Sequence, residues 1–474
     1  MASPLKSTEV HRRSVTRGGA GVVTAPSDRA LLMFAGPVSG GLLAQSLMTL
    51  VSTAMVGRLG ESSLAGVGVA SALFGVLLAL LYGPVAAVQA LTARTLGAGR
   101  PAEGGRVLNE GLMLGGGLSL VLAALAMFGC AALLPVMLHD AAAAEAGARY
   151  LLGFGPIVVC LAANMTFSAH WNGSAVPRRA LNISVLQLPL HVLFNYALVF
   201  GHFGAPALGV FGAGLGSTLG AACASLMHLA LATRFAPIAG FLRARPTWAG
   251  VRTLLVIGLP ISLQQSMLCV ALAIYFAIVA RMGVGSAAGL NAIGSLLAIP
   301  GLLASGVGAA AATYVGAALG RGEAPVAARA GWRSARLGAL VVTPLALVLV
   351  LAPGHALGLF LKDPAGAALA TLPLRILALS VAADAFTMAL ISSLNGAGAT
   401  RLASAVSFAL QWAQLPLCWY MGAQLGFGLT GVGVVFLARS LIEAAILAAL
   451  WRAGWWRRAL AATADNEALA ARLC

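Results

Sequence analysis

The amino-acid sequence predicts an all-α membrane protein with twelve transmembrane helices in two parallel six-helix repeats, related by a pseudo-two-fold axis along the membrane normal. The chain of 474 residues is 60% hydrophobic and only 9% charged, with a mean hydropathy of +0.94. A soluble domain carries roughly 25% charged residues, so this composition indicates a protein embedded in a lipid bilayer. About twelve long apolar stretches and an internal repeat of 223 residues complete the prediction.

The repeat holds through three separated blocks of sequence. LLMFAGPVS at 31–39 aligns with LLVIGLPIS at 254–262, and GRLGESSLAG at 57–66 aligns with ARMGVGSAAG at 280–289. One constant offset through all the blocks indicates two copies of one unit, as in transporters whose site lies between two halves. The third block contributes the pairs Asn172/Asn395, Gly173/Gly396 and Arg178/Arg401.

Each predicted span is an apolar stretch of about 20 residues or more, the length that crosses a bilayer. Six spans in each copy bring both copies into the membrane from the same side, so the repeats are parallel and not inverted. The stretches lie at 30–56, 64–93, 107–135, 150–171, 180–201, 209–233, 251–280, 287–313, 337–361, 370–394, 402–424 and 430–451.

The distribution of basic residues predicts the orientation. With both termini in the cytoplasm, 23 of the 29 Lys and Arg lie in cytoplasmic tails and loops, five lie on the other side, and Arg439 falls within a span. This bias follows the positive-inside rule and accounts for the net charge of +16 without nucleic-acid binding. We therefore expect a multi-pass protein of a bacterial inner membrane with both termini cytoplasmic.

The predicted organisation is a cytoplasmic N-terminal tail at 1–27, a six-helix bundle at 28–235, a cytoplasmic linker at 236–250, a second bundle at 251–451 and a cytoplasmic tail at 452–474. The basic segment before the first span resembles the start of a signal peptide. Because the first span has a counterpart inside the chain, we expect it to be retained. The six cysteines show no ligand spacing, so no metal site is predicted.

Two acidic residues lie mid-span, Asp384 and Glu443. A charged side chain inside a membrane is energetically costly, so it usually belongs to a functional site or to an ion pair. Arg439 precedes Glu443 by one helical turn, which favours a structural ion pair between them. Asp384 has no basic residue within two turns on its own helix. It must therefore pair across helices, carry a proton or bind a cation.

Polar residues also follow single helical faces within spans. Gln187, His191 and Asn195 recur at i, i+4 and i+8, and Gln411 and Gln414 share a face in the equivalent helix of the second copy. Such stripes form interhelical hydrogen bonds or line a wet cavity, and their presence in both copies favours the cavity. The predicted cavity residues are Gln265, Tyr275, Gln411 and Gln414 in the second bundle and Ser52, Gln187, His191 and Asn195 in the first.

These motifs resemble multidrug and toxic compound extrusion (MATE) transporters of the NorM/DinF-like type. The resemblance rests on the paired openings, VSTAMVGRLG at 51–60, the Gly-Ala-Gly-Arg turn at 97–100, and the NGSAVPRR and NGAGATR segments, and it covers about 28–451. It implies a secondary antiporter that expels organic cations in exchange for H⁺ or Na⁺. Walker, HExxH and GxSxG sequences are missing, so we expect neither an enzyme nor nucleotide-driven transport.

The resemblance also implies roles for individual residues. Asp384, twelve residues before Gly396, matches the helix-ten aspartate of NorM-type members, which makes it the expected ion-coupling residue. Ser52 and Asn195 stand where other members have aspartates in helices one and five. Helix seven lacks the acid associated with Na⁺ binding. H⁺ is therefore the favoured coupling ion and Na⁺ the less favoured one, with no further cofactor.

The expected function is export of organic cations and drugs by alternating access, with Asp384 taking either a proton or a cation. The expected partners are small, cationic, amphiphilic substrates and membrane lipids, and we expect a monomer. Two alternatives stay open. A lipid-linked oligosaccharide flippase would need several basic residues in its cavity, and a membrane glycosyltransferase or polymerase would need a large external loop.

Overall fold

The computed structural model describes residues 26–235, 238–361 and 364–457, and these contain helices and no strand. The α-helices are connected by short turns, and in three places the chain widens into a π-helix (η1–η3). The elements are α2 (Asp28–Gly57), α3 (Glu61–Gly97), α4 (Pro101–Ala124), η1 (Leu125–Cys130), α5 (Ala131–Met137), α6 (Ala141–Phe154), α7 (Ile157–Gly173), α8 (Arg178–Phe200), α9 (Gly209–Ala230), η2 (Leu231–Phe235), α10 (Trp248–Ala280), α11 (Val284–Gly320), α12 (Ala324–Leu351), α13 (Pro353–Gly358), α14 (Pro364–Gly396), α15 (Thr400–Trp419), η3 (Tyr420–Gln424) and α16 (Gly428–Arg452).

Ten helical segments of the described chain are long and apolar enough to cross a membrane. The pair α6 and α7, bent by 50° at a short break, makes an eleventh if it counts as one span. The segment predicted as a span at 402–424 is helical and consists of α15 and η3. It is not among the ten segments that are long and apolar enough to cross a membrane. Polar residues such as Ser404, Gln411 and Gln414 lower its apolar character.

The span predicted at 337–361 was placed wrongly. The helix there, α12, begins at Ala324 and ends at Leu351, and the separate short helix α13 follows it. Hydropathy located only the apolar part of α12. Its first turns carry arginines that the sequence assigned to a loop, among them Arg333, which forms an ion pair with Asp28 at the start of α2.

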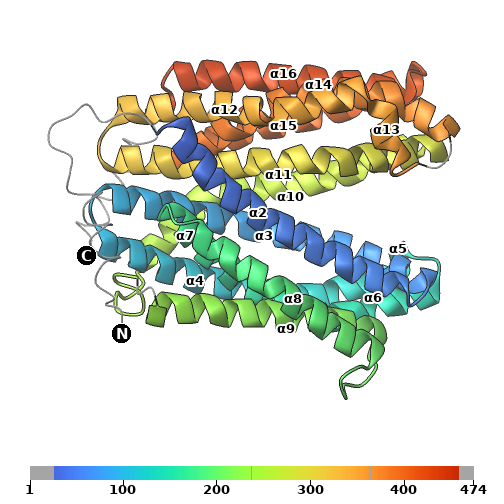
Figure 1. The fold of residues 1–474 in the computed structure, drawn as a ribbon, viewed down its shortest axis with the longest axis horizontal. Coiled ribbons are helices and arrows are strands. Elements are labelled where there is room, and N and C mark those ends of the chain that lie inside the picture. Colours follow the sequence, from blue (N-terminus) through green and yellow to red (C-terminus); the bar gives the residue numbers. More distant parts are fainter. Residues whose placement is uncertain (1–25, 236–237, 362–363, 458–474) are drawn as a thin grey trace.

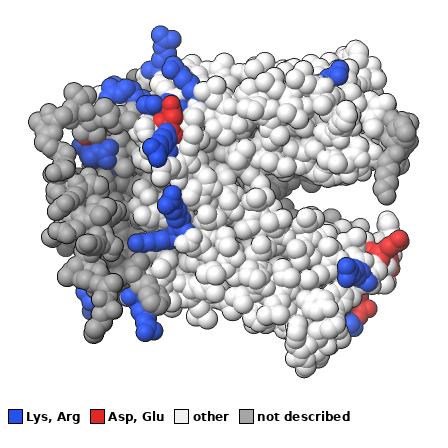
Figure 2. All heavy atoms as spheres, in the orientation of Figure 1, with Lys and Arg blue, Asp and Glu red and all other residues white. Residues whose placement is uncertain are grey.

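Helices α10–α16 form one group and α3–α9 another, with α2 running obliquely between them (Figure 1). Most of the visible Lys and Arg lie at one end of this assembly, which we call the basic end (Figure 2). At the opposite end Figure 2 shows a hollow that opens between the two groups of helices. The groups are therefore in contact near the basic end and apart at the other.

Glycines allow close helix contacts between the groups, and equivalent glycines do so in both copies of the repeat. A Cβ on Gly83 of α3 would collide with the Gly258 carbonyl and the Ser262 hydroxyl of α10, and one on Gly306 of α11 would collide with Ala35 and Ser39 of α2. Each residue of the second contact lies 223 positions from its counterpart in the first. The same holds for Gly97, which packs on Ala317, and Gly320, which packs on Arg94. The offset found in the sequence therefore recurs in the packing.

Two turn glycines follow the offset as well. Gly60 before α3 and Gly283 before α11 have φ of 116° and 117°, a region that residues with a Cβ rarely adopt. Both copies therefore enter the long second helix through the same backbone geometry.

Gly83→Val is expected to destabilise the protein, because the added side chain must push α3 away from α10. Overpacking of this kind costs about 1–3 kcal/mol. A fall in the midpoint of thermal unfolding, measured on purified protein in detergent, checks it. Gly68→Val, on the same helix with nothing within 4 Å of its Cβ position, is the matched control. Equal melting of the two variants would show that the glycine contact does not limit stability.

Candidate functional site

Three charged side chains meet between α14 and α16. We call Asp384, Arg439 and Glu443 the acid–arginine cluster. Arg439 Nη2 lies 3.3 Å from Asp384 Oδ1, and Arg439 Nη1 pairs with Glu443 Oε2 on its own helix. The sequence paired Arg439 with Glu443 alone, but the structure gives this arginine a second carboxylate. Of the three routes open to Asp384, the structure shows pairing across helices.

Serine hydroxyls from three helices complete the cluster. The Ser440 hydroxyl donates to Asp384 Oδ1 at 2.6 Å, and Ser380, one turn before Asp384, donates to its Oδ2 at 2.9 Å. Ser407 of α15 donates to Glu443 Oε1 at 2.7 Å. None of these three serines was predicted from the sequence to belong to the site. Only Ser380 carried a local signal, since its i, i+4 spacing places it beside Asp384.

The two carboxylates differ in exposure. The Glu443 side chain is 4% exposed and that of Arg439 16%, whereas the Asp384 side chain is 42% exposed. Asp384 is therefore half-exposed, although it lies mid-span. Of the two acids, Asp384 is the more accessible one.

The positive charge of Arg439 does not balance the two acids of the cluster. Two carboxylates and one guanidinium carry a net charge of −1 when both acids are ionised. The guanidinium also lies 5.7 Å from the centre of the Phe436 ring, which in turn packs against Tyr275 of α10 at 5.0 Å. A single proton or a single monovalent cation would neutralise this site.

A second polar cluster joins α2, α8 and α9. His191 Nε2 lies 2.8 Å from the Ser52 hydroxyl and 3.2 Å from the Met48 carbonyl oxygen. The Asn195 amide donates to the His191 carbonyl and to the Ser217 hydroxyl. The structure thus brings together Ser52, His191 and Asn195, which the sequence placed in one cavity, and adds Ser217.

The predicted glutamines are not part of either hydrogen-bonded cluster. Gln187 and Gln414 are buried, and Gln265 and Gln411 are partly exposed. Both amide atoms of Gln414 lack a hydrogen-bond partner among the described residues. Tyr275 is buried and packs against Phe436, whose ring lies beside Arg439.

Comparisons with known proteins identify relatives along most of the chain. The model of the MatE family matches residues 37–197 and 260–420, two segments displaced by 223 residues at both ends. The "Probable multidrug resistance protein NorM" of Pseudomonas putida is 32% identical, with 85% of this chain and 89% of that protein covered. The protein of the same name from Bradyrhizobium diazoefficiens is 29% identical, with 89% and 92% covered.

Solved structures share the fold. One, described as the outward-facing conformation of a multidrug resistance MATE family transporter, superposes with a TM-score of 0.81 at 19% identity, covering 92% of this chain and 96% of the other. A crystal structure of MATE in the straight conformation gives a TM-score of 0.83, also at 19% identity, covering 92% of this chain and 97% of the other.

Proposed function

The chain belongs to the MatE family, and from this premise we propose that it is an inner-membrane antiporter that exports organic cations and drugs in exchange for H⁺. The observation that carries the proposal is the acid–arginine cluster, whose net charge of −1 sits within a membrane-spanning bundle and ends in the half-exposed Asp384. The NorM-named relatives support the drug substrates.

In this proposal two six-helix halves alternate between openings to the two sides of the membrane. The basic end is cytoplasmic, as the positive-inside rule favours. The hollow at the opposite end then makes the structure outward-open, and the glycine contacts close the cytoplasmic side (Figure 2). Opening to the cytoplasm would require α3 and α11 to separate from their partners in the other half.

Asp384 is proposed as the exchange site. Met388, one turn nearer the basic end on the same face of α14, places its sulfur 3.8 Å from the Ser305 hydroxyl of α11. This face of α14 is therefore directed toward α11, which itself packs against α2 and α3. A cation entering between the halves would meet the carboxylate of Asp384 there.

Exchange then follows from competition for one negative charge. When the site opens to the cytoplasm, ionised Asp384 attracts a cationic substrate. When it opens outside, a proton neutralises Asp384 and the substrate leaves, while Arg439 stays held by Glu443. A single carboxyl suffices for a proton, whereas Na⁺ takes several oxygen ligands. The cluster offers two carboxylates already bound to a guanidinium, which favours H⁺.

The antiport proposal predicts that adding a cationic dye to energised everted vesicles releases stored protons. The dye enters the vesicle as protons leave, since both use the same carboxylate. A pH-sensitive fluorophore in the vesicles records the release. Vesicles lacking the chain are the control, and dye movement that follows a Na⁺ gradient but ignores pH would overturn H⁺ as the coupling ion.

A further inference from the structure

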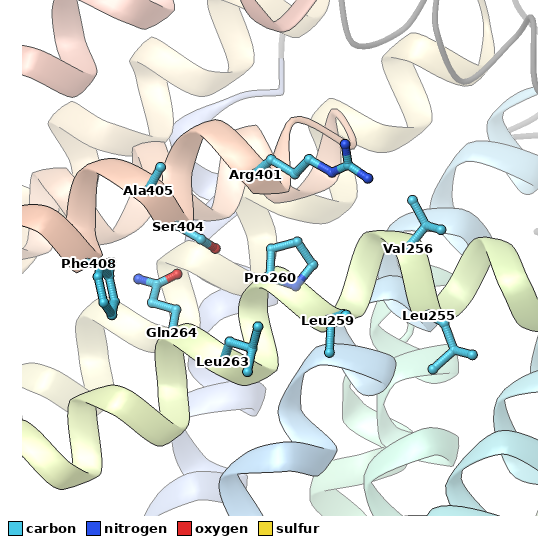
Figure 3. Close-up of a pocket in the computed structure, with 10 residues that line it drawn as sticks. All are labelled: Leu255, Val256, Leu259, Pro260, Leu263, Gln264, Arg401, Ser404, Ala405 and Phe408. Atoms are coloured by element: carbon cyan, nitrogen blue, oxygen red, sulfur yellow. The ribbon is translucent and has the colours of Figure 1, made fainter.

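A groove of about 490 Å³ lies between α10 and α15, apart from the acid–arginine cluster. Its lining is apolar except for three residues: Arg401 and Ser404 on α15, and Gln264 on α10. Figure 3 shows Ser404 and Gln264 directed into the same space, with Arg401 toward the end near Val256. The lining residues are Leu255, Val256, Leu259, Pro260, Leu263, Gln264, Arg401, Ser404, Ala405 and Phe408.

The two copies differ in sequence at this helix contact. At the 223 offset, Leu259, Leu263 and Gln264 align with Gly36, Gly40 and Gly41. In the first copy a Cβ on Gly40 would be 3.1 Å from Leu181 Cδ1 of α8, whereas one on Gly36 would have nothing within 4 Å. The second copy carries larger side chains at these three positions, and they line the groove between α10 and α15.

The polar groups of the groove are arranged from its rim inward. Arg401, in the first turn of α15, is exposed and is the charged residue among those that line the groove. Ser404, one turn deeper, is 6% exposed, and its hydroxyl has no hydrogen-bond partner among the described residues. Phe408 lies a further turn along the same face, about 10 Å from Arg401 along the axis.

This order matches the chemistry of one class of ligand. The rim carries a positive charge, the middle offers the Gln264 amide beside the buried Ser404 hydroxyl, and the rest of the surface is apolar. A cationic substrate would be repelled by Arg401, and a small inorganic anion would leave the apolar surface uncovered. An amphiphile with an anionic head, polar ester linkages and a hydrocarbon chain complements all three parts.

We propose that this groove binds an anionic phospholipid of the leaflet at the basic end. The Arg401 guanidinium binds the phosphate, since basic side chains at a membrane surface attract anionic headgroups. The Gln264 amide donates a hydrogen bond to an ester oxygen. One acyl chain covers Leu259, Leu263 and Phe408. This lipid site does not depend on the proposed exchange mechanism.

Native mass spectrometry of the full chain, titrated with phosphatidylglycerol or with phosphatidylethanolamine, tests this site. The wild type is expected to retain phosphatidylglycerol in preference. Arg401→Gln is expected to weaken its binding at least about tenfold, the scale of one charge-assisted hydrogen bond. Ala405→Trp, which fills the groove, is expected to abolish phosphatidylglycerol binding while leaving Arg401 in place. Arg452→Gln, at the basic end of α16 and outside the lining, is the matched control.

Several results would overturn the proposal. Wild-type affinity for phosphatidylglycerol in Arg401→Gln or in Ala405→Trp would place the lipid elsewhere. Equal binding of phosphatidylethanolamine would remove the role of the charge. Equal binding of glycerol 3-phosphate would identify a free phosphate site, and displacement of the lipid by a cationic dye would identify a substrate site. The melting temperature of each variant in detergent distinguishes lost binding from lost folding.

Discussion

Replacing Asp384 with Asn is expected to abolish proton-coupled export while leaving the protein folded in the membrane. Asn keeps the shape of Asp, its carbonyl oxygen can accept from Ser440 and Arg439, and its amide can donate to the Ser380 hydroxyl. The cluster changes from a net charge of −1 to zero. It can then neither bind a proton nor attract a cation, and exchange stops.

The measurement is dye-driven proton release from everted vesicles, with the amount of protein in the membrane determined on the same samples. Asp384→Asn should fall to the level of vesicles without the chain, with a melting temperature within a few degrees of wild type. Asp384→Glu is the matched variant, because it keeps the charge and moves it by one methylene. It should retain partial exchange with a shifted pH optimum. Wild-type exchange by Asp384→Asn would assign coupling to another group.

Removing Arg439 is expected to produce the largest loss of stability within the cluster. In Arg439→Gln the carboxylate of Glu443, which is 4% exposed, keeps Ser407 as a partner but loses its counter-charge. Breaking a buried ion pair from one side costs about 3–5 kcal/mol, because an uncompensated charge stays inside. Low expression and a lowered melting temperature are the expected results.

The double variant Arg439→Gln/Glu443→Gln separates charge from packing. It leaves no uncompensated buried acid, so it should regain most of the stability lost by Arg439→Gln alone. Glu443→Gln alone should cost less, since Arg439 can still pair with Asp384. A thermal-unfolding cycle over the four proteins checks this. If Arg439→Gln melts like wild type, the pair adds nothing to stability, and if Glu443→Gln is folded but inactive, Glu443 and not Asp384 carries the coupling.

The sequence by itself was sufficient to predict the all-helical membrane fold and most helix positions, because the length of an apolar stretch is a local property of the chain. It was also sufficient for the offset of 223 residues, which the family model and the glycine contacts both follow. It was misleading at α12, where the helix extends beyond its apolar part, and it did not predict the exposure of Asp384, which depends on where α14 meets its neighbours.

The tertiary structure alone decided which polar groups meet. Hydropathy and helical periodicity place Asp384 on a face of α14 and Arg439 on a face of α16, but not the rotation and depth at which the two faces touch. The same reason applies to Ser407, which reaches Glu443 from a third helix, and to the groove beside Arg401. Contacts between helices depend on register across the bundle, and no local pattern in the chain contains that register.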